Sequence, residues 1–437
     1  TQRLGFTTDN QGRRTDTYLQ TNVGRTTWAA HTHNDFDTSG RVTRTIAKRG
    51  PVSTAVVSLD VSYCYNNATP APTCSTGAAT DRSKLQWERN NLTGQVSTYS
   101  YDTGGRILQA AQTGGSASNN TWAYSYDSRG NRLTANVTGS TPSSQTFTVN
   151  AANQITTTGY SFDGAGNMTA DTAGTYTYNG ADQMTTVTKA GSTYNYKYAG
   201  ASQNEVLEQQ KSGATVKLVY GRTNQQNQPV IEQAQLGTVT AYITNDPVTG
   251  QPLMLQTSTG TVSLYVYSGN NGSPVGLITD AGIQSYSYEF DPYGTPVLTA
   301  GGTGNGISQN PFLFQGGIQD RATGWVKFGA RWYNPATGRW TQQDTFDNPL
   351  DPKNANRYAY AGNDPINNVD PSGRAIDDLD LDGINDAGAV GFFGGLAGGC
   401  VTGAFFGAVG CLPGAFAGAA GGIVAGLVGA TVGQLLE

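Results

Sequence analysis

The sequence predicts a mainly β protein whose antiparallel hairpins repeat along the chain and wind into a spiralling shell, followed by a short glycine-rich helical segment. Three observations lead to this fold class. The 437 residues include 58 Gly and 23 Tyr but only 13% charged residues, a composition typical of strands and tight turns. A short turn motif recurs along most of the chain. The last part of the chain then changes to an apolar composition rich in Gly, Ala and Val.

The recurring motif is an aromatic residue, Asp, two variable residues, Gly, and then Arg or Asn. In each copy we expect the aromatic to end a strand, the Asp or Asn side chain to fold back onto the backbone, and Gly to adopt a positive φ. Each copy is therefore predicted to be the turn of a hairpin. The clear copies are FDTSGRV (36–42), YDTGGRI (101–107), YDSRGNRL (126–133), FDGAGNM (162–168) and FDPYGTP (290–296), and the weaker ones are TDNQGRR (8–14) and YNGADQM (178–184).

The segments between the turns alternate aromatic and polar residues, as in TWAYSYD, TYTYNG and TYNYKYAG. Because successive side chains of a strand point to opposite faces, this pattern places the rings on one face of a sheet. A single hairpin cannot bury such a face alone, so neighbouring hairpins must stack into a continuous sheet. The spacing of the repeats varies from roughly 16 to 40 residues, which argues against the equal blades of a propeller and favours a spiral.

The chain divides into four predicted parts: a repeat shell (1–310), a core (311–374), an acidic linker (375–389) and a glycine-rich tail (390–437). The repeats resemble those of the Rhs/YD-repeat proteins. The core contains GARWYNPATGRW, NRYAYAGNDP and VDPSG in that order, and it is closely similar to the Rhs repeat-associated core of this polymorphic toxin family. The resemblance implies a hollow β-shell that the core plugs and that encloses a toxic C-terminal polypeptide. Since the shell portion is short for such a container, we expect an open, partial shell or further N-terminal repeats.

The resemblance also implies a self-cleaving site, because the core of this family is an aspartic autoprotease that cuts just beyond an Asp-Pro-x-Gly motif. Matching the motifs assigns the two aspartates to Asp344 and Asp370, the supporting arginine to Arg331, and the cut to the bond between Arg374 and Ala375. Two close carboxylates cannot both ionise, so one can act as an acid while the other activates water. The family usually has Leu in place of Arg374, so a pocket built for Leu would have to accept a cation. The alternative is that both aspartates are turn residues.

The linker contains DLDLDGINDA, which resembles a thrombospondin type 3 calcium loop. Carboxylates at alternate positions of such a loop converge on one hard cation, and Gly383 would provide the sharp turn. The usual last acidic ligand is absent because Ala389 occupies its position, so we expect weak calcium binding and no organic cofactor. The alternative is a solvated acidic linker. The expected ligands are Asp378, Asp380, Asp382, the backbone carbonyl of Ile384, and Asp386.

The tail has no charged side chain between residues 387 and 436, and its glycines recur mostly at every fourth position. That spacing is the small-xxx-small pattern by which membrane helices approach closely. Pro413 divides the tail into two pieces of about 25 and 21 residues, each long enough to span a bilayer as a helix. We expect a helical hairpin that permeabilises membranes. The alternatives are a plain membrane anchor and a glycine-rich plug inside the shell.

The four cysteines form two close pairs, and this spacing together with the low charge indicates an oxidising exterior. We predict a Cys64–Cys74 disulfide across YNNATPAPT, the alternative being four reduced cysteines. The expected location is outside a bacterial cell, secreted or on its surface. Because the sequence begins at Thr1 without a leader, we expect a processed chain or a fragment of a longer one.

Two histidines are too few for a three-histidine zinc site or for a Ser/His/Asp or Cys/His catalytic group. His31 and His33 lie in WAAHTHNDFD with no Cys or Glu at ligand spacing, so we interpret them as exposed strand residues. The net charge of −5 provides no basic patch, and we expect no nucleic-acid partner. Beyond self-cleavage, no enzyme activity is predicted.

Two functions fit these observations. In the first, the shell encloses its own tail, the core frees it, and the tail damages a target-cell membrane, with an immunity protein as the expected neutralising partner. In the second, the protein is a non-toxic surface or wall-associated molecule whose Tyr-, Trp- and Asn-rich strands hold carbohydrate or protein, and the tail is its anchor.

Overall fold

The structure is a computed structural model that describes residues 3–22, 24, 26–66, 70, 74, 83–115, 118–200, 203–211, 213–224, 228–301, 308–345, 355–374 and 377–378. These residues form antiparallel strands and short 3₁₀ helices, and the described part of the chain contains no α-helix. The predicted mainly β fold class is therefore confirmed. The tail, for which a helical hairpin is predicted, lies outside the described residues. The 3₁₀ helices are η1 (Val52–Thr54), η3 (Phe314–Gly316) and η4 (Ala361–Asn363).

Two long ladders form the shell, and in both of them each strand pairs with its neighbours in sequence. The first ladder is β1 (Arg3–Thr8), β2 (Arg14–Gln20), β3 (Trp28–Phe36), β4 (Val42–Arg49), β5 (Val56–Cys64), β6 (Trp87–Asn90), β7 (Val96–Tyr101), β8 (Ile107–Thr113), β9 (Asn120–Tyr126), β10 (Arg132–Gly139) and β11 (Ser143–Thr146). A hairpin bridged at Val149 and Ile155 leads from it to the second ladder.

The second ladder continues the same hairpin order along residues 161–301. It comprises β12 (Ser161–Phe162), β13 (Met168–Ala170), β14 (Gly174–Tyr178), β15 (Met184–Lys189), β16 (Ser192–Gly200), β17 (Gln203–Lys211), β18 (Ala214–Thr223), β19 (Pro229–Leu236), β20 (Val239–Asn245), β21 (Pro252–Thr257), β22 (Val262–Tyr267), β23 (Pro274–Thr279), β24 (Gln284–Phe290) and β25 (Pro296–Gly301).

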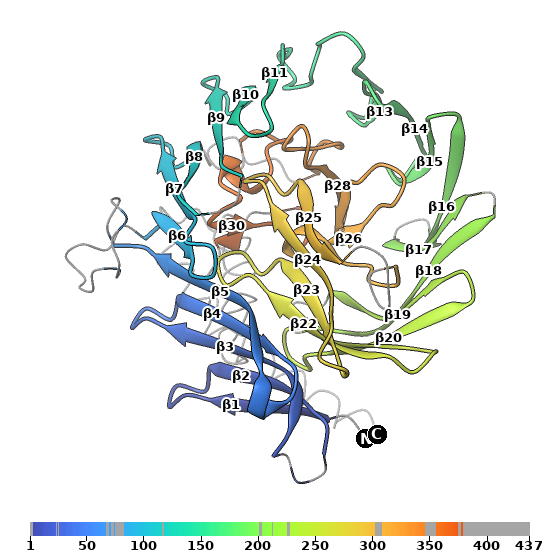
Figure 1. Ribbon diagram of the computed structural model, residues 1–437. Coiled ribbons are helices and arrows are strands. Elements are labelled where there is room, and N and C mark those ends of the chain that lie inside the picture. Colours follow the sequence, from blue (N-terminus) through green and yellow to red (C-terminus); the bar gives the residue numbers. More distant parts are fainter. Residues whose placement is uncertain are drawn as a thin grey trace, which may run out of the picture.

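The two ladders wind into a spiral whose end returns to its beginning (Figure 1). The strands run from β1 up one side of the molecule to β11, down the other side to β20, and back toward the first strands, so that β22 and β23 lie against β2 and β3. At this seam the backbone of Gly269 lies directly against side chains of the first ladder. A Cβ on Gly269 would lie 2.5 Å from Thr45 Oγ1 and 2.7 Å from Val42 Cγ1, so only glycine fits there. An ion pair between Arg14 and Asp246 also joins the two ends.

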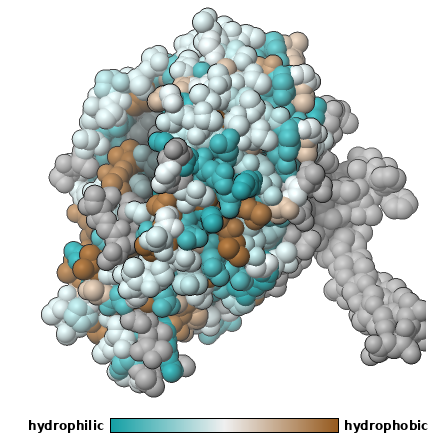
Figure 2. All heavy atoms as spheres, turned by 90° about the vertical axis from the view of Figure 1, so that its right-hand side faces the viewer, coloured by the Kyte–Doolittle hydropathy of each residue, from teal (hydrophilic) through white to brown (hydrophobic). Residues whose placement is uncertain are grey.

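Buried side chains hold the seam together, and the faces turned away from them are more polar. The seam cluster contains aliphatic side chains from both ends of the spiral. Figure 2 shows a face of the molecule on which pale and hydrophilic residues dominate and hydrophobic ones lie in small separate groups. This one-sided burial is what the aromatic and polar alternation predicts. The seam cluster consists of Leu19, Ala30, Ala47, Val262, Leu264, Val266 and Ile278.

Eight turns of the described shell share one geometry, which explains the repeated motif. In each, the Oδ1 atom of an Asp or Asn accepts the backbone N–H groups two and four residues later, at 2.8–3.1 Å. The residue three positions later has a positive φ, and it is Gly in six of the eight. The sequence motif missed one copy, VNAANQ, in which Asn153 takes the position of the glycine. The eight leading residues are Asp9, Asp37, Asp102, Asp127, Asn150, Asp163, Asn179 and Asp291.

The last residue of the motif links one turn to the next. Arg106 closes its own turn through Asp102 (Nε to Oδ2, 2.6 Å), donates to the carbonyl of Asp127 in the following turn (2.9 Å), and stacks over the Tyr126 ring. Where the last residue is Asn, its amide makes the link instead, as from Asn167 to Asp182 (2.8 Å). The turns therefore form continuous columns along the spiral.

The core lies inside the curve of the two ladders and docks on a column of turns (Figure 1). Asn363 donates to the carbonyl of Gly130 (2.8 Å), and Tyr358 donates to that of Gly166 (2.8 Å). An ion pair between the buried Asp364 and the partly exposed Lys84, which lies just before β6, ties the core to the first ladder. The core strands are β26 (Ile318–Gln319), β27 (Val326–Phe328), β28 (Arg331–Asn334), β29 (Arg339–Trp340) and β30 (Asn368–Val369). The short strand β31 (Asp377–Asp378), in the predicted linker, pairs with β30.

Candidate functional site

Arg331 is the first residue of β28, an inner strand of the four-stranded core sheet β26–β29. Its side chain is buried, and its guanidinium carbon lies 4.1 Å from the centre of the Trp340 ring on β29. The Nη1 atom donates to the carbonyl of Arg357 (3.1 Å). Packing and hydrogen bonds therefore hold this guanidinium in one position.

The structure brings together the three residues that the sequence assigned to the site. Arg331 Nη2 lies 2.7 Å from Asp344 Oδ2 and 3.2 Å from Asp370 Oδ2. Asp344 follows β29, where its N–H donates to the carbonyl of Arg357 (3.0 Å), and Asp370 follows β30. Asp370 is 1% exposed and Asp344 is 9% exposed, so the cluster is shielded from bulk water.

Two glycines allow the loop of residues 370–374 to lie against the hairpin that carries Arg331. A Cβ on Gly329 would lie 2.1 Å from the carbonyl oxygen of Ser372, and one on Gly373 would lie 2.4 Å from that of Phe328. Both glycines also have a positive φ. The N–H of Ala330 donates to the same Ser372 carbonyl (2.9 Å). The glycines of FGARW and DPSG are thus explained by backbone contact.

The loop next to the predicted cut is tied directly to the charged cluster. Arg331 Nε donates to the carbonyl of Gly373 (2.5 Å), and the N–H of Arg374 donates to Asp370 Oδ1 (3.1 Å). Ser372 Oγ donates to the same Oδ1 atom (3.1 Å). Arg374 itself is exposed, so its cationic side chain needs no apolar pocket. Ala375, on the other side of the predicted cut, lies outside the described residues.

Burial lowers the pKa of two basic groups in the core, Arg331 and Lys327. Burial lowers the pKa of Arg331, while Asp344 and Asp370 oppose the shift. Lys327 on β27 is 3% exposed, and burial lowers its pKa to about 7, with Glu205 opposing and Arg374 adding to the shift. A low-dielectric setting of this kind strengthens each interaction between charges.

One guanidinium nitrogen, Arg331 Nη2, contacts both carboxylates, which is the position expected of a supporting arginine. The arrangement therefore offers carboxylate oxygens that can accept a proton from water and a fixed cation that can stabilise a developing oxyanion. The hydrogen bonds of Asp370 to its own loop also fit the alternative of a turn residue.

Sequence reasoning missed three residues of this cluster. Trp340 stacks on the guanidinium, the carbonyl of Arg357 accepts from it, and Ser372 donates to Asp370. Trp340 and Ser372 belong to the motifs GRW and DPSG. These motifs marked the region as part of the core, but they did not predict that the two side chains contact the charged cluster. The link to Arg357 is made by its backbone, which no side-chain pattern can predict.

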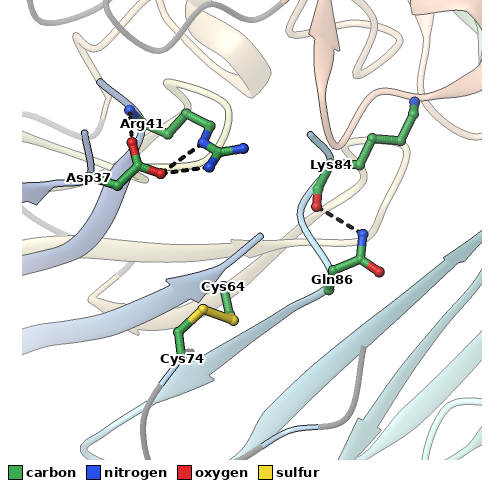
Figure 3. The surroundings of a disulfide bond; sticks show 6 residues. All are labelled: Asp37, Arg41, Cys64, Cys74, Lys84 and Gln86. Carbon is green, nitrogen blue, oxygen red and sulfur yellow. Dashed lines mark hydrogen bonds and ion pairs between the residues drawn. A yellow bond between two sulfur atoms is a disulfide. The ribbon is translucent and has the colours of Figure 1, made fainter. Parts of the chain in front are cut away.

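The structure also brings the predicted cysteine pair together, since Cys64 and Cys74 form a disulfide with a Cα–Cα distance of 5.4 Å (Figure 3). Cys64 ends β5 and packs with Trp87 and Val96 in a small buried cluster. The nearby Asp37–Arg41 ion pair belongs to one of the eight turns.

Most of the predicted calcium ligands lie outside the described residues, as does the tail with the second pair of cysteines, Cys400 and Cys411. Asp378 is in β31, whose backbone pairs with Asn368 and Val369 of β30. Asp380, Asp382, Ile384 and Asp386 are not described. Across the described ranges, the structure has no helix with the length and hydropathy needed to cross a membrane.

A separate cleft of about 370 Å³ opens between β5–β9 and the segment that runs from the loop after β22 to β25. Aromatic rings and amides line it, together with Glu88 and Glu289. Burial raises the pKa of Glu88 to about 7, the Tyr99 hydroxyl that donates to it (2.9 Å) opposes the shift, and Glu289 adds to it. The cleft is of a size that suits a small molecule.

Comparison with known proteins identifies the family. The model of the Teneurin YD-shell family matches residues 82–366, which is more than half of the chain. Salivary gland surface protein 1 of Aedes aegypti is 32% identical over 98 residues, which are 22% of this chain and 3% of that protein. The tRNA nuclease WapA of Bacillus subtilis (strain 168) is 28% identical over 107 residues, which are 24% of this chain and 4% of that protein.

Two solved structures share the fold over most of the chain. A structure of the Photorhabdus luminescens Tc holotoxin pore matches with a TM-score of 0.64 and 16% identity, over 85% of this chain and 19% of that one. The crystal structure of TcdB2-TccC3 matches with a TM-score of 0.63 and 18% identity, over 85% of this chain and 21% of that one. The chain thus spans about a fifth of each. It belongs to the Teneurin YD-shell family and is an Rhs/YD-repeat shell protein with the fold of toxin-related shells.

Proposed function

We propose that this chain is a toxin shell whose core cuts its own backbone between Arg374 and Ala375 and so releases the segment that follows. The observation that carries the proposal is the contact of Asp344 and Asp370 with one guanidinium, that of Arg331, beside the loop that ends at Arg374. Two further contacts support it, because Arg331 donates to the carbonyl of Gly373 and Asp370 accepts from the N–H of Arg374.

The proposed reaction is hydrolysis of one peptide bond. A carboxylate, which we assign to Asp344, takes a proton from water as the water oxygen attacks the carbonyl carbon of Arg374. Arg331 stabilises the oxyanion that forms, and Asp370 holds Arg374 in place. The proton then passes to the nitrogen of Ala375, the bond breaks, and the products are a carboxylate at Arg374 and an amine at Ala375.

Replacing Asp370 tests this proposal most simply. We expect purified wild-type protein to give two bands on a denaturing gel and Asp370→Asn to give one full-length band, with unchanged circular dichroism. Asp37→Asn, in a shell turn, is the matched control, since it keeps an oxygen acceptor and should still give two bands. Two bands from Asp370→Asn would contradict the assignment, and one band from wild type would make the core structural.

We further propose that the released tail permeabilises a target-cell membrane, which would require a neutralising immunity protein in the producing cell. The support is its uncharged sequence and its period-four glycines. The tail peptide 390–437 should release dye from liposomes. Replacing Gly403, Gly407 and Gly414 by Leu should stop the release, whereas replacing them by Ala, which keeps the small-residue face, should preserve most of it. Release that survives the Leu variant would contradict helix packing, and no release by wild type would leave the tail as an anchor.

The second candidate function is a surface protein that binds carbohydrate, and the cleft beside Glu88 specifically favours it. Tyr63, Tyr99, Trp122 and Tyr288 line this cleft, and aromatic rings with nearby amides suit a sugar. A helix of about 21 residues is about 30 Å long and about 10 Å wide, so the cleft cannot hold half of the tail. Enclosure of the tail is supported instead by the curvature of the ladders. An intact wild-type chain together with an inactive tail would favour this second function.

Two further parts of the proposal concern the location of the protein and calcium binding. The disulfide and the likeness to toxin structures support a secreted or extracellular location. Weak calcium binding by residues 378–386 is supported by their sequence alone. A calcium titration of wild type and of Asp380→Asn tests it, and equal heats from the two would contradict it.

A further inference from the structure

The register of β2 and β3 places three potential metal ligands on one patch of the shell. Asp16 pairs directly with His33, and Tyr18 pairs with His31. Leu19 and its partner Ala30, which are fully buried, point to the opposite face and pack in the seam cluster. The side chains of Asp16 and the two histidines therefore lie on the other face of the sheet.

The three side chains converge on each other. His31 Nε2 and His33 Nδ1 each lie 2.8 Å from Asp16 Oδ1. The three ligand atoms lie within 4.8 Å of one another. The side chains of Asp16 and His31 are 15% and 13% exposed and that of His33 is 32% exposed, so the cluster is ordered by its surroundings but open on one side.

A second layer of contacts orients these three groups. Asp35 Oδ1 lies 3.2 Å from His33 Nε2, the ring nitrogen that faces away from Asp16. The Thr15 hydroxyl donates to Asp16 Oδ2 (2.9 Å), which leaves Oδ1 for the histidines. The His31 ring stacks on Tyr18, with ring centres 4.4 Å apart and planes 6° apart. A carboxylate behind a ligating histidine is the usual support of a metal site.

We propose that Asp16, His31 and His33 bind a divalent transition-metal ion of the zinc class. Two imidazole nitrogens and one carboxylate oxygen are a ligand set that such ions take in proteins. The ion would replace the hydrogen bonds that the histidines now share with Asp16 Oδ1, and each ligating nitrogen would release any proton it carries. Three protein ligands leave a fourth position for water or for a donor atom of an approaching molecule. Lys48, which pairs with His31 on β4, is the nearby positive charge that works against the ion.

Calorimetric titration of the full chain with zinc chloride tests the proposal. We expect one strong equivalent for wild type that His31→Gln and Asp16→Asn each remove. Asp35→Asn, which weakens only the support of His33, should lower the affinity by about 10- to 100-fold. Asp60→Asn is the matched control, because Asp60 lies on the same ladder in an ion pair with Arg44 and should bind zinc as wild type does.

Zinc should also raise the melting temperature of wild type, because an ion that binds only the folded state stabilises it. His31→Gln and Asp16→Asn should melt at the same temperature with and without zinc. Any zinc that the acidic segment 378–386 takes up would persist in both variants and is thereby separated from the proposed site. A wild-type protein that binds no zinc, or a His31→Gln variant that binds it as tightly as wild type, would overturn the proposal.

Discussion

The turns of the shell and the charged cluster of the core are built on different length scales. Each shell turn is closed by contacts within five residues, such as those of Asp37 with Ser39 and Arg41. The core cluster instead joins Arg331 and Asp370, which are 39 residues apart in sequence. A turn that depends only on local contacts can be repeated along the chain without depending on distant segments. The core cluster, in contrast, depends on the correct position of every segment that meets there.

The difference predicts how each region responds to damage. A broken turn removes hydrogen bonds from one hairpin, and its neighbours still pair along the ladder. A shift of the loop at residues 370–374 would separate Asp370 from Arg331 and remove the proposed chemistry altogether. The contacts between the core and the turns at Gly130 and Gly166 tie the two regions together.

The largest effect should come from Gly329→Ala in the core. The new Cβ would lie 2.1 Å from the Ser372 carbonyl, so the loop that carries Arg374 must move away from Arg331. We expect loss of the split at residue 374 on a denaturing gel, although both carboxylates remain.

Gly324→Ala is the matched control for this change, because Gly324 is also a core glycine with a positive φ but has open space around it. It should cost about 1–2 kcal/mol of stability, because Ala tolerates a positive φ poorly, and keep the split. Normal cleavage by Gly329→Ala would show that the contact of the loop with the hairpin is not required.

The next largest effect should come from Lys327→Met, which is expected to change the stability of the folded protein. Burial lowers the pKa of Lys327 to about 7 in the folded protein, while in the unfolded chain it is about 10.4, so between these values the unfolded chain binds the extra proton. The lysine therefore destabilises wild type most below pH 7, and this penalty fades as the pH rises toward 10.4. We expect Lys327→Met to gain on the order of a few kcal/mol near pH 6 and much less near pH 10.

The measurement is the difference in melting temperature between the variant and wild type at each pH. Taking this difference removes the contribution of all groups that titrate in the same way in both proteins. Lys211→Met, a strand lysine of the shell that is exposed, is the control and should show no such dependence. A Lys327→Met gain that is equal at pH 6 and pH 10 would contradict a buried charge at this position.

The smallest effect should come from Asp37→Ala in a shell turn. The change removes the acceptor of two backbone N–H groups and of Arg41, and we expect a loss of about 1–2 kcal/mol with cleavage unchanged. Asp37→Asn should cost less, because Asn150 and Asn179 hold equivalent turns. Loss of cleavage in Asp37→Ala would show that the two regions are coupled more tightly than their contacts indicate.

The same contrast explains what the sequence could predict. The turns were predictable because Asp, Gly and Arg or Asn stand at fixed spacing, and the side of each strand that is buried followed from the alternation of Tyr with polar residues. The copy at Asn150 was missed because Asn153 adopts the positive φ that the motif reserves for Gly. In the core, the motifs identified Arg331, Asp344 and Asp370, but not the stacking of Trp340 on the guanidinium or the hydrogen bond from Arg331 to the backbone of Arg357.

Contacts between strands were the hardest to predict. His31 and His33 were interpreted as exposed strand residues because no Cys or Glu stands at ligand spacing from them in sequence. Asp16 is brought to them by the pairing of β2 with β3, and that register depends on the loop between the strands. A search for acidic residues one strand away on the same face would have found it.

The central claim is that the cluster of Arg331, Asp344 and Asp370 cuts the chain after Arg374. Intact-mass spectrometry of the purified wild-type protein tests it most directly. We expect two masses, those of residues 1–374 and 375–437, which locate the cut to a single bond. A single mass for the whole chain, or a cut at any other bond, would contradict it.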